Sequence, residues 1–157
     1  MYKLILKSDL LSNKLTDYGL SKKILSDIEK IEHTSYLKMP MVKNCLIEIF
    51  LQHGFLKRAR LHQNHNLFIT GSKSKTGLCI QMGHKSGLYF DLFKLAYMHK
   101  TGLIKNAIII LPSIELEKFC KTSSVATFEL ISKQMDLFKG IINFEPQLMC
   151  VDILRRD

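Results

Sequence analysis

The sequence predicts one α/β domain in which helices flank a mixed central β-sheet. The elements expected from its pattern run helix, helix, hairpin, helix, strand, helix, strand, an order typical of α/β proteins. The chain has 157 residues, of which 46% are hydrophobic and 24% charged. This length and composition suit a single globular core. We therefore expect one domain over residues 1–157, with a helical extension at 1–38 and the core at 39–154.

The first half of the chain contains two predicted helices. Residues Tyr2 to Leu6 fit either a short strand or a turn of helix, and the pattern does not decide between them. Ser21 to Ile31 has apolar residues on one helical face, with Ser21 as the N-cap. Pro40 begins a second amphipathic helix over Met41 to His53, and Gly54 is placed to end it.

The second half alternates strands with helices. An extended basic segment at Phe55 to Leu61 and a polar turn at 63–66 precede a hairpin. The remaining elements are, in order, a strand at Leu67 to Ile69, a basic turn at Gly71 to Gly77, a strand at Leu78 to Met82, a helix at Leu88 to His99, an apolar strand at Ala107 to Leu111, a helix at Ser124 to Phe138 ended by Gly140, and a strand at Gln147 to Leu154.

The net charge of +9 is spread along the chain. Such an excess either keeps a protein soluble or forms a surface that contacts nucleic-acid phosphates. Arg58 and Arg60 are one strand period apart and should share a face, where guanidinium groups suit phosphate or guanine. Six residues around the hairpin are the candidate DNA contacts: Lys57, Arg58, Arg60, Lys73, Lys75 and Lys85. The alternative is an edge strand whose charges only protect it from pairing with other chains.

The cysteines and the first residues bear on location. No C-x-x-C pair occurs among Cys45, Cys79, Cys120 and Cys150. We expect buried free thiols in a reducing compartment. Lys3, Lys7 and Asp9 interrupt the first apolar residues, and no apolar run is long enough to span a membrane. The expectation is a soluble, cytoplasmic protein without membrane contact.

Several ordered motifs between Met39 and Ile153 resemble a known family. They are a Pro-led helix closing on Gly54-Phe55, Ile80-Gln81-Met82-Gly83-His84-Lys85, Tyr89-Phe90-Asp91-Leu92-Phe93-Lys94, Gly102-Leu103-Ile104 leading into Ile108 to Pro112, and Phe128-Glu129. Their order and spacing resemble the BglII/BstYI type of restriction endonuclease, a branch of the PD-(D/E)xK nuclease fold. The resemblance implies a restriction-endonuclease-like core, double-stranded DNA as partner and a two-fold dimer.

In that family the active site is an Asp, a Glu nine residues later and a Gln two residues further on. Gln81 is kept here, whereas the Asp and Glu positions fall on Thr70 and Cys79. The hairpin from Leu67 to Met82 contains no Asp or Glu in any register. Mg²⁺ prefers hard carboxylate oxygens, which a neutral hydroxyl and a soft sulfur do not supply. The resemblance therefore implies degenerate catalytic acids and no metal site.

Acids elsewhere in the chain are reserve candidates for relocated catalysis. Asp91, which matches an Asp of the family, is expected to be a structural anchor, and Glu48 a solvated helix position. A zinc site at His62 and His65 lacks a C-x-x-C partner. A nucleophilic Cys79 would need an exposed thiolate, which an apolar strand does not offer.

These observations favour a DNA-binding, catalytically degenerate restriction-endonuclease-like protein without a cofactor. It would act as a homodimer or as a non-cutting subunit paired with a related active enzyme. The first alternative is an active Mg²⁺-dependent endonuclease with relocated acids. The second is a protein-interaction scaffold for a DNA-modifying enzyme.

Overall fold

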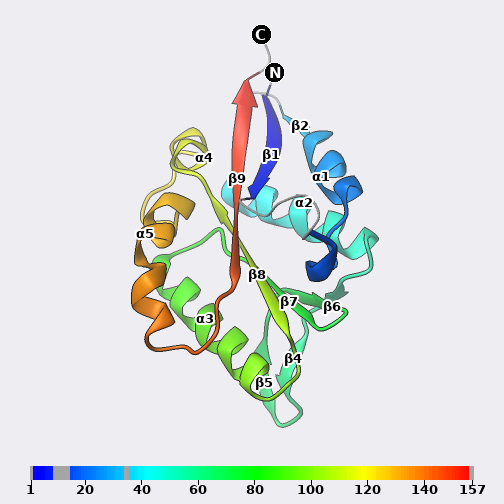
Figure 1. The fold of residues 1–157 in the computed structure, drawn as a ribbon. Helices are drawn as coiled ribbons and strands as arrows, with labels where there is room; N and C mark the ends of the chain where they lie inside the picture. The colour runs from blue at the N-terminus through cyan, green and yellow to red at the C-terminus, as the bar shows by residue number, and fades with distance from the viewer. Residues whose placement is uncertain (1, 9–14, 34–35, 156–157) are drawn as a thin grey trace.

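A seven-stranded mixed sheet forms the centre of the computed structural model, which describes residues 2–8, 15–33 and 36–155 (Figure 1). Its strand order is β2-β1-β9-β8-β7-β6-β3. β8 pairs in parallel with both β7 and β9, and the other pairings are antiparallel. The strands are β1 (Tyr2–Ser8), β2 (Glu32–His33), β3 (Leu56–Lys57), β6 (Gly71–Lys73), β7 (Thr76–Ile80), β8 (Asn106–Pro112) and β9 (Gln147–Arg155).

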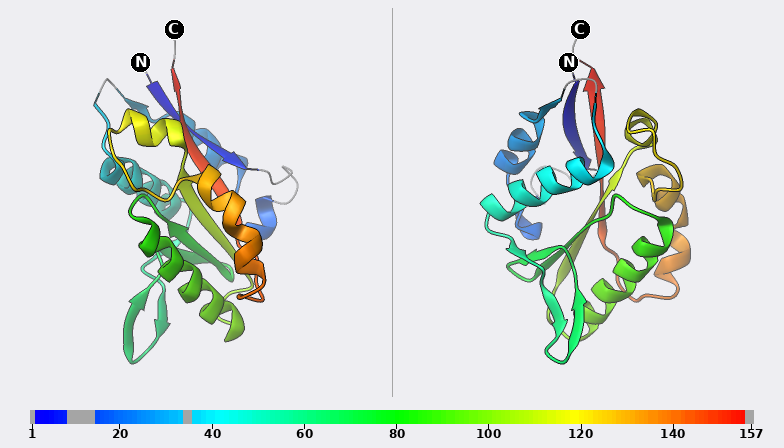
Figure 2. Two further views of the ribbon diagram at one scale, coloured as in Figure 1. Left: turned by 90° about the vertical axis from the view of Figure 1, so that its left-hand side faces the viewer. Right: turned by 180° about the vertical axis from the view of Figure 1, so that it is seen from behind.

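Helices cover both faces of this sheet (Figure 2). α1 (Lys22–Glu29) and α2 (Met39–Gln52) pack on one face, against Leu78 and Ile80 of β7. α3 (Lys85–Lys100) and α5 (Phe128–Lys139) pack on the other, where Cys79 lies. This alternation along β7 divides the core into two layers and confirms the predicted α/β class with a mixed sheet between helices.

The hairpin that ends in β7 is shorter than the sequence predicts. β7 pairs with β6, in the register Gly71 to Leu78, rather than with the predicted strand at 67–69. Ser74 and Lys75 form the turn with φ of +47° and +65°. Non-glycine residues in this region are uncommon, so the sequence pattern did not narrow the predicted turn at Gly71 to Gly77 to these two residues.

A second, two-stranded sheet extends away from the main one at the bottom of Figure 1. It consists of β4 (Arg60–His62) and β5 (His65–Phe68), joined by a turn at Gln63 and Asn64. The predicted polar turn at 63–66 is thus shorter by two residues, because His65 and Asn66 belong to β5.

The first 38 residues contribute more than a helical extension. β1 pairs antiparallel with β9 along seven residue pairs, so the ambiguous segment after Met1 is a strand of the main sheet. A short 3₁₀ helix, η1 (Leu15–Tyr18), precedes α1, which Ser21 caps as predicted. Residues 9–14 and 34–35 of this extension lie outside the described part of the chain.

Two boundaries near the C-terminus differ from prediction. α5 begins at Phe128 rather than Ser124, because Ser124 has a φ of +62° and Thr127 is extended. A short helix, α4 (Ile114–Phe119), was not predicted, although Ser113 caps it through the Leu116 N–H at 2.9 Å. No helix within the described ranges is long and apolar enough to cross a membrane. All four cysteines are free, and Cys79, Cys120 and Cys150 are buried, as expected.

Candidate functional site

Thr70, Cys79 and Gln81 are brought together at the end of β7. Thr70 lies between β5 and β6, and its Oγ1 accepts a hydrogen bond of 3.0 Å from the Ile80 N–H. Cys79 and Gln81 are two residues apart on an extended segment, so both side chains face α3. The spacing argument therefore located three neighbouring positions in space.

Gln81 is held by both ends of its side-chain amide. Its Oε1 accepts from the Gly83 N–H at 3.0 Å, and its Nε2 donates to Asp91 Oδ2 at 3.2 Å. Only 8% of the residue is exposed. A Cβ on Gly87 would lie 2.7 Å from Nε2, so α3 approaches Gln81 this closely because residue 87 is glycine. Gln81 thus joins the end of β7 to the first turns of α3.

Asp91 connects Gln81 to a lysine. The second carboxylate oxygen of Asp91 is 2.5 Å from Lys94 Nζ, one helical turn further along α3. Lys94 Nζ also donates to the Phe68 carbonyl at 2.9 Å and lies 5.0 Å from the centre of the Phe90 ring. The side chains of Asp91 and Lys94 are only 16% and 13% exposed. A continuous polar chain therefore runs from Gln81 to the residue two positions before Thr70.

The thiol of Cys79 is fully buried on the same side of the sheet. Burial raises its pKa strongly, and the nearby Asp91 carboxylate raises it further. The group is therefore a neutral thiol at physiological pH, unsuited to act as a nucleophile or to hold a hard cation. Glu48 is exposed on α2, the helix that packs against the opposite face of the sheet.

These residues do not fit a magnesium ion. The Thr70 hydroxyl is neutral, and both oxygens of Asp91 already have partners in Gln81 and Lys94. The described part of the chain contains no group of three or more His, Cys, Asp or Glu residues that could hold a metal. His62 and His65 face each other across the β4–β5 hairpin, with ring centres 5.1 Å apart.

The structure brings two of the six candidate DNA contacts together. The guanidinium groups of Arg58 and Arg60 lie 4.5 and 5.3 Å from the centre of the Phe68 ring, and both residues are exposed. Arg58 has a φ of +54°, and its N–H donates to the Thr70 carbonyl at 2.9 Å. Both arginines thus belong to the segment that leads into the site. Lys57 precedes them, exposed on β3.

The three other lysines lie on separate elements. Lys73 Nζ donates to the carbonyls of His53 and Gly19, so it ties β6 to the end of α2. Lys75 Nζ donates to the Gly102 carbonyl just beyond α3, whereas Lys85 is the first residue of that helix. Sixteen residues of helix separate these ends by about 24 Å. The six candidate DNA contacts are therefore spread over several elements, and their contact with DNA stays a prediction.

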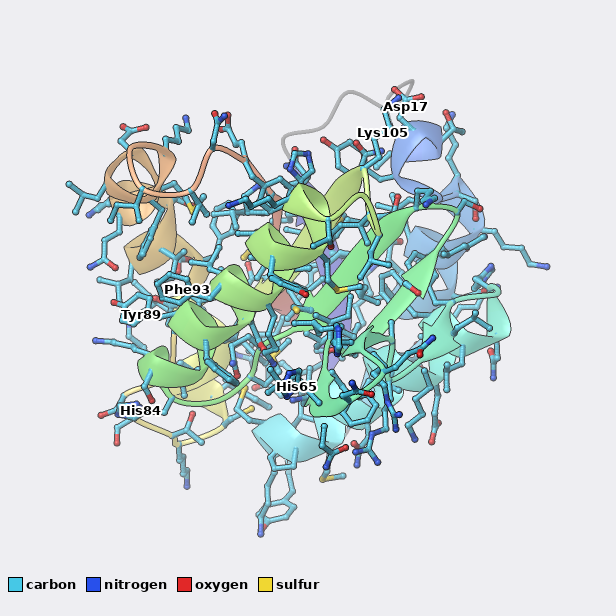
Figure 3. All side chains as sticks on the ribbon, turned by 90° about the horizontal axis from the view of Figure 1, so that it is seen from below. Asp17, His65, His84, Tyr89, Phe93 and Lys105 are labelled. Carbon is cyan, nitrogen blue, oxygen red and sulfur yellow. The ribbon has the colours of Figure 1, made fainter. Side chains whose placement is uncertain are left out.

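The sequence reasoning also missed Lys94 and Phe68. Lys94 follows Asp91 at the i, i+3 spacing that brings helical side chains together, and this signal was available in the sequence. The Phe68 carbonyl became a partner only through the fold, since it is 26 residues from Lys94. In Figure 3 His84 marks the start of α3, Tyr89 and Phe93 lie along the helix, and His65 of β5 lies beside it, where it lines a pocket with Phe93.

Comparison with known proteins gives one family and one fold. The model of the family described as restriction endonuclease BglII/BglIII matches residues 8–144. A crystal structure of restriction endonuclease BglII complexed with a DNA 16-mer is similar, with a TM-score of 0.70 and 13% identity over 99% of this chain and 79% of that chain. Free BglII gives a TM-score of 0.58 and 15% identity, over 99% and 80%. No curated protein matches.

Proposed function

Because the chain belongs to the BglII/BglIII restriction endonuclease family, we propose that it binds double-stranded DNA at the β7–α3 site without cutting it. The protein would then be a degenerate member of a nuclease family. Mg²⁺ would have a role only if the protein were an active enzyme. The observation that carries the proposal is the set of contacts around Gln81. By the family resemblance, Thr70, Cys79 and Gln81 would occupy the catalytic positions, and none of them offers a carboxylate.

Hydrolysis of a phosphodiester by this family's chemistry needs a metal ion that activates water and offsets charge on the phosphate. Asp91 is the acid beside these three residues, and Lys94 already neutralises it at 2.5 Å. Glu48 is exposed on the helix of the opposite sheet face. Relocated acids therefore have little support from the geometry, and cleavage is the less favoured function.

DNA binding is supported by charge and by the arginine pair. The net charge is +9, and Arg58 and Arg60 are exposed beside the segment that carries Thr70. Arginine contacts phosphates or guanines in a bidentate manner. The structurally similar BglII was solved with a DNA 16-mer. By that likeness the duplex would lie across the end of β7, near the Phe68 ring that both guanidinium groups contact.

The first test is to incubate the pure protein with mixed-sequence duplex DNA and Mg²⁺ or Mn²⁺ at two salt concentrations, and to measure both retention and cleavage. We expect retention that weakens steeply with salt, and no cleavage. Cleavage that disappears in Asp91→Ala or Glu48→Ala would establish relocated acids instead. If the protein neither retains nor cleaves DNA, the scaffold function with a protein partner is favoured.

The matched variants for the binding surface are two double mutants with equal charge change. Arg58→Ala with Arg60→Ala should weaken retention and reduce the salt dependence by about two charges. Lys22→Ala with Lys23→Ala removes two exposed charges from α1 and should leave binding nearly unchanged. Equal losses in both pairs would mean that the net charge, rather than this site, binds DNA.

An exposed apolar surface supports a protein partner in addition to DNA. Phe93 and Tyr97 of α3 are 61% and 44% exposed, and they line one pocket with Ile141 after α5, which is 72% exposed. Large exposed apolar side chains gathered on one side often mark an interface. We expect a second copy of this chain there, with a related active chain as the other outcome. Light scattering of the wild type and of Phe93→Glu tests this, because a homodimer should become a monomer in the variant.

A further inference from the structure

The ammonium group of Lys94 lies in a cage of oxygen atoms and one aromatic ring. Asp91 Oδ1 is 2.5 Å from Lys94 Nζ, the Phe68 carbonyl oxygen is 2.9 Å away, and the Phe90 ring centre is 5.0 Å away. Carboxylate and carbonyl oxygens are also the groups by which proteins hold divalent cations. The cage therefore has the chemistry of a cation site, and its cation is part of the chain.

This ammonium is not an ordinary surface charge. Lys118 and Glu115 on α4 have the same i, i+3 spacing, but their side chains are 67% and 68% exposed. The side chains of Lys94 and Asp91 are 13% and 16% exposed. Water therefore screens the α3 pair much less than the α4 pair.

The position of Lys94 also connects the elements that make the site. Phe68 ends β5, two residues before Thr70, and Asp91 carries the chain of contacts to Gln81 after β7. Removing the ammonium would leave the Asp91 carboxylate largely shielded from water without a counter-charge. The lysine side chain thus links the end of β5 to α3 beside Thr70 and Gln81.

We propose that Lys94 is the resident cation of this site, whose residues leave no place for a divalent ion. The site is then complete without metal, and neither folding nor DNA binding responds to Mg²⁺ or to chelation. This inference deepens the proposed function, on which its DNA-binding part rests. The part that concerns the stability of the site is independent of DNA.

The test begins with the unaltered protein. Its melting temperature and its retention of duplex DNA are measured with EDTA and with millimolar Mg²⁺. Both quantities should be unchanged within error. A rise in melting temperature with Mg²⁺ would overturn the proposal, because it would show a metal site in the folded state. If the melting temperature is insensitive and DNA is not retained at all, the proposed function fails while the resident cation stands.

A double-mutant cycle then tests the cage itself. Lys94→Met should lower the melting temperature by about 5 °C or more, because it leaves a shielded carboxylate unpaired. Asp91→Asn added to Lys94→Met should recover at least half of that loss. Lys118→Met, in the exposed pair on α4, should shift the melting temperature by only about 1 °C. Equal effects of Lys94→Met and Lys118→Met, or no recovery in the double variant, would contradict the proposal.

Discussion

Gln81→Ala tests whether the two side-chain hydrogen bonds of this residue stabilise the site. The substitution removes a hydrogen bond from the Gly83 N–H and another to the Asp91 carboxylate, of 3.0 and 3.2 Å. A neutral hydrogen bond contributes about 0.5–1.5 kcal/mol and one to a charged group about 1.5–3 kcal/mol. We therefore expect the free energy of unfolding to fall by about 2–4 kcal/mol, measured by urea denaturation monitored by circular dichroism.

The control is Gln52→Ala, at the exposed last residue of α2. It should change the free energy of unfolding by no more than about 0.5 kcal/mol. Gln81→Glu separates hydrogen bonding from charge, because it keeps an acceptor for Gly83 but places a second carboxylate beside Asp91. If Gln81→Ala lowers the free energy of unfolding no more than Gln52→Ala does, the hydrogen bonds of Gln81 do not stabilise the site.

Three further predictions concern the surrounding frame. Gly77→Ala should lower the free energy of unfolding by about 1–3 kcal/mol in a urea titration, because its Cβ would lie 2.9 Å from a methyl carbon of Leu95. Lys73→Met should lower the melting temperature but not the affinity for DNA, since its ammonium donates to the carbonyls of His53 and Gly19; a loss of affinity alone would assign it to the DNA surface. Burial acts to raise the pKa of Asp152, but hydrogen bonds from Lys7 and Ser113 outweigh it and hold the pKa below its ordinary value of 3.8. The stability that Asp152→Asn removes should therefore be present at pH 7 and shrink as the pH falls below 3.8, as unfolding at pH 7 and pH 3 would show.

The helices α1 and α2 and the buried strand β8 were predictable because their signals are local. Ser21 caps α1, Gly54 follows α2 with a φ of +86°, and the apolar run in β8 is buried on both faces of the sheet. Each signal depends on residues a few positions apart, so no knowledge of the tertiary structure was needed.

The hairpin and the first strand were harder for a physical reason. Ser74 and Lys75 adopt a left-handed turn without glycine, and this conformation is maintained by the pairing of β6 with β7. The Tyr2–Ser8 segment becomes a strand because β9, almost 150 residues later, offers an edge for it. Both outcomes depend on long-range pairing, which a local pattern does not contain.

The candidate site was predictable in position but not in its connections. Counting from Gln81 placed Thr70 and Cys79, and the structure brings Thr70 within hydrogen-bond distance of the residue after Cys79. The side-chain partners of the candidate DNA contacts were not predictable, because the partner of a long side chain depends on where its end lies in the fold. Lys73 reaches backbone carbonyls, whereas Arg58 reaches the Phe68 ring.

The absence of acids at these positions also has a consequence for folding. Two carboxylates close together repel each other unless a cation or a proton neutralises them. A nuclease site without its metal therefore lowers the stability of the surrounding fold. Here Thr70 accepts a hydrogen bond from Ile80, and Cys79 is a neutral buried thiol. The one remaining carboxylate, Asp91, has a lysine partner. Thr70→Asp with Cys79→Glu should therefore lower the melting temperature in EDTA by several degrees. Mg²⁺ should recover part of that loss, because the two introduced carboxylates supply the oxygens that it prefers. An equal melting temperature with EDTA and with Mg²⁺ would mean that the introduced acids do not form a metal site.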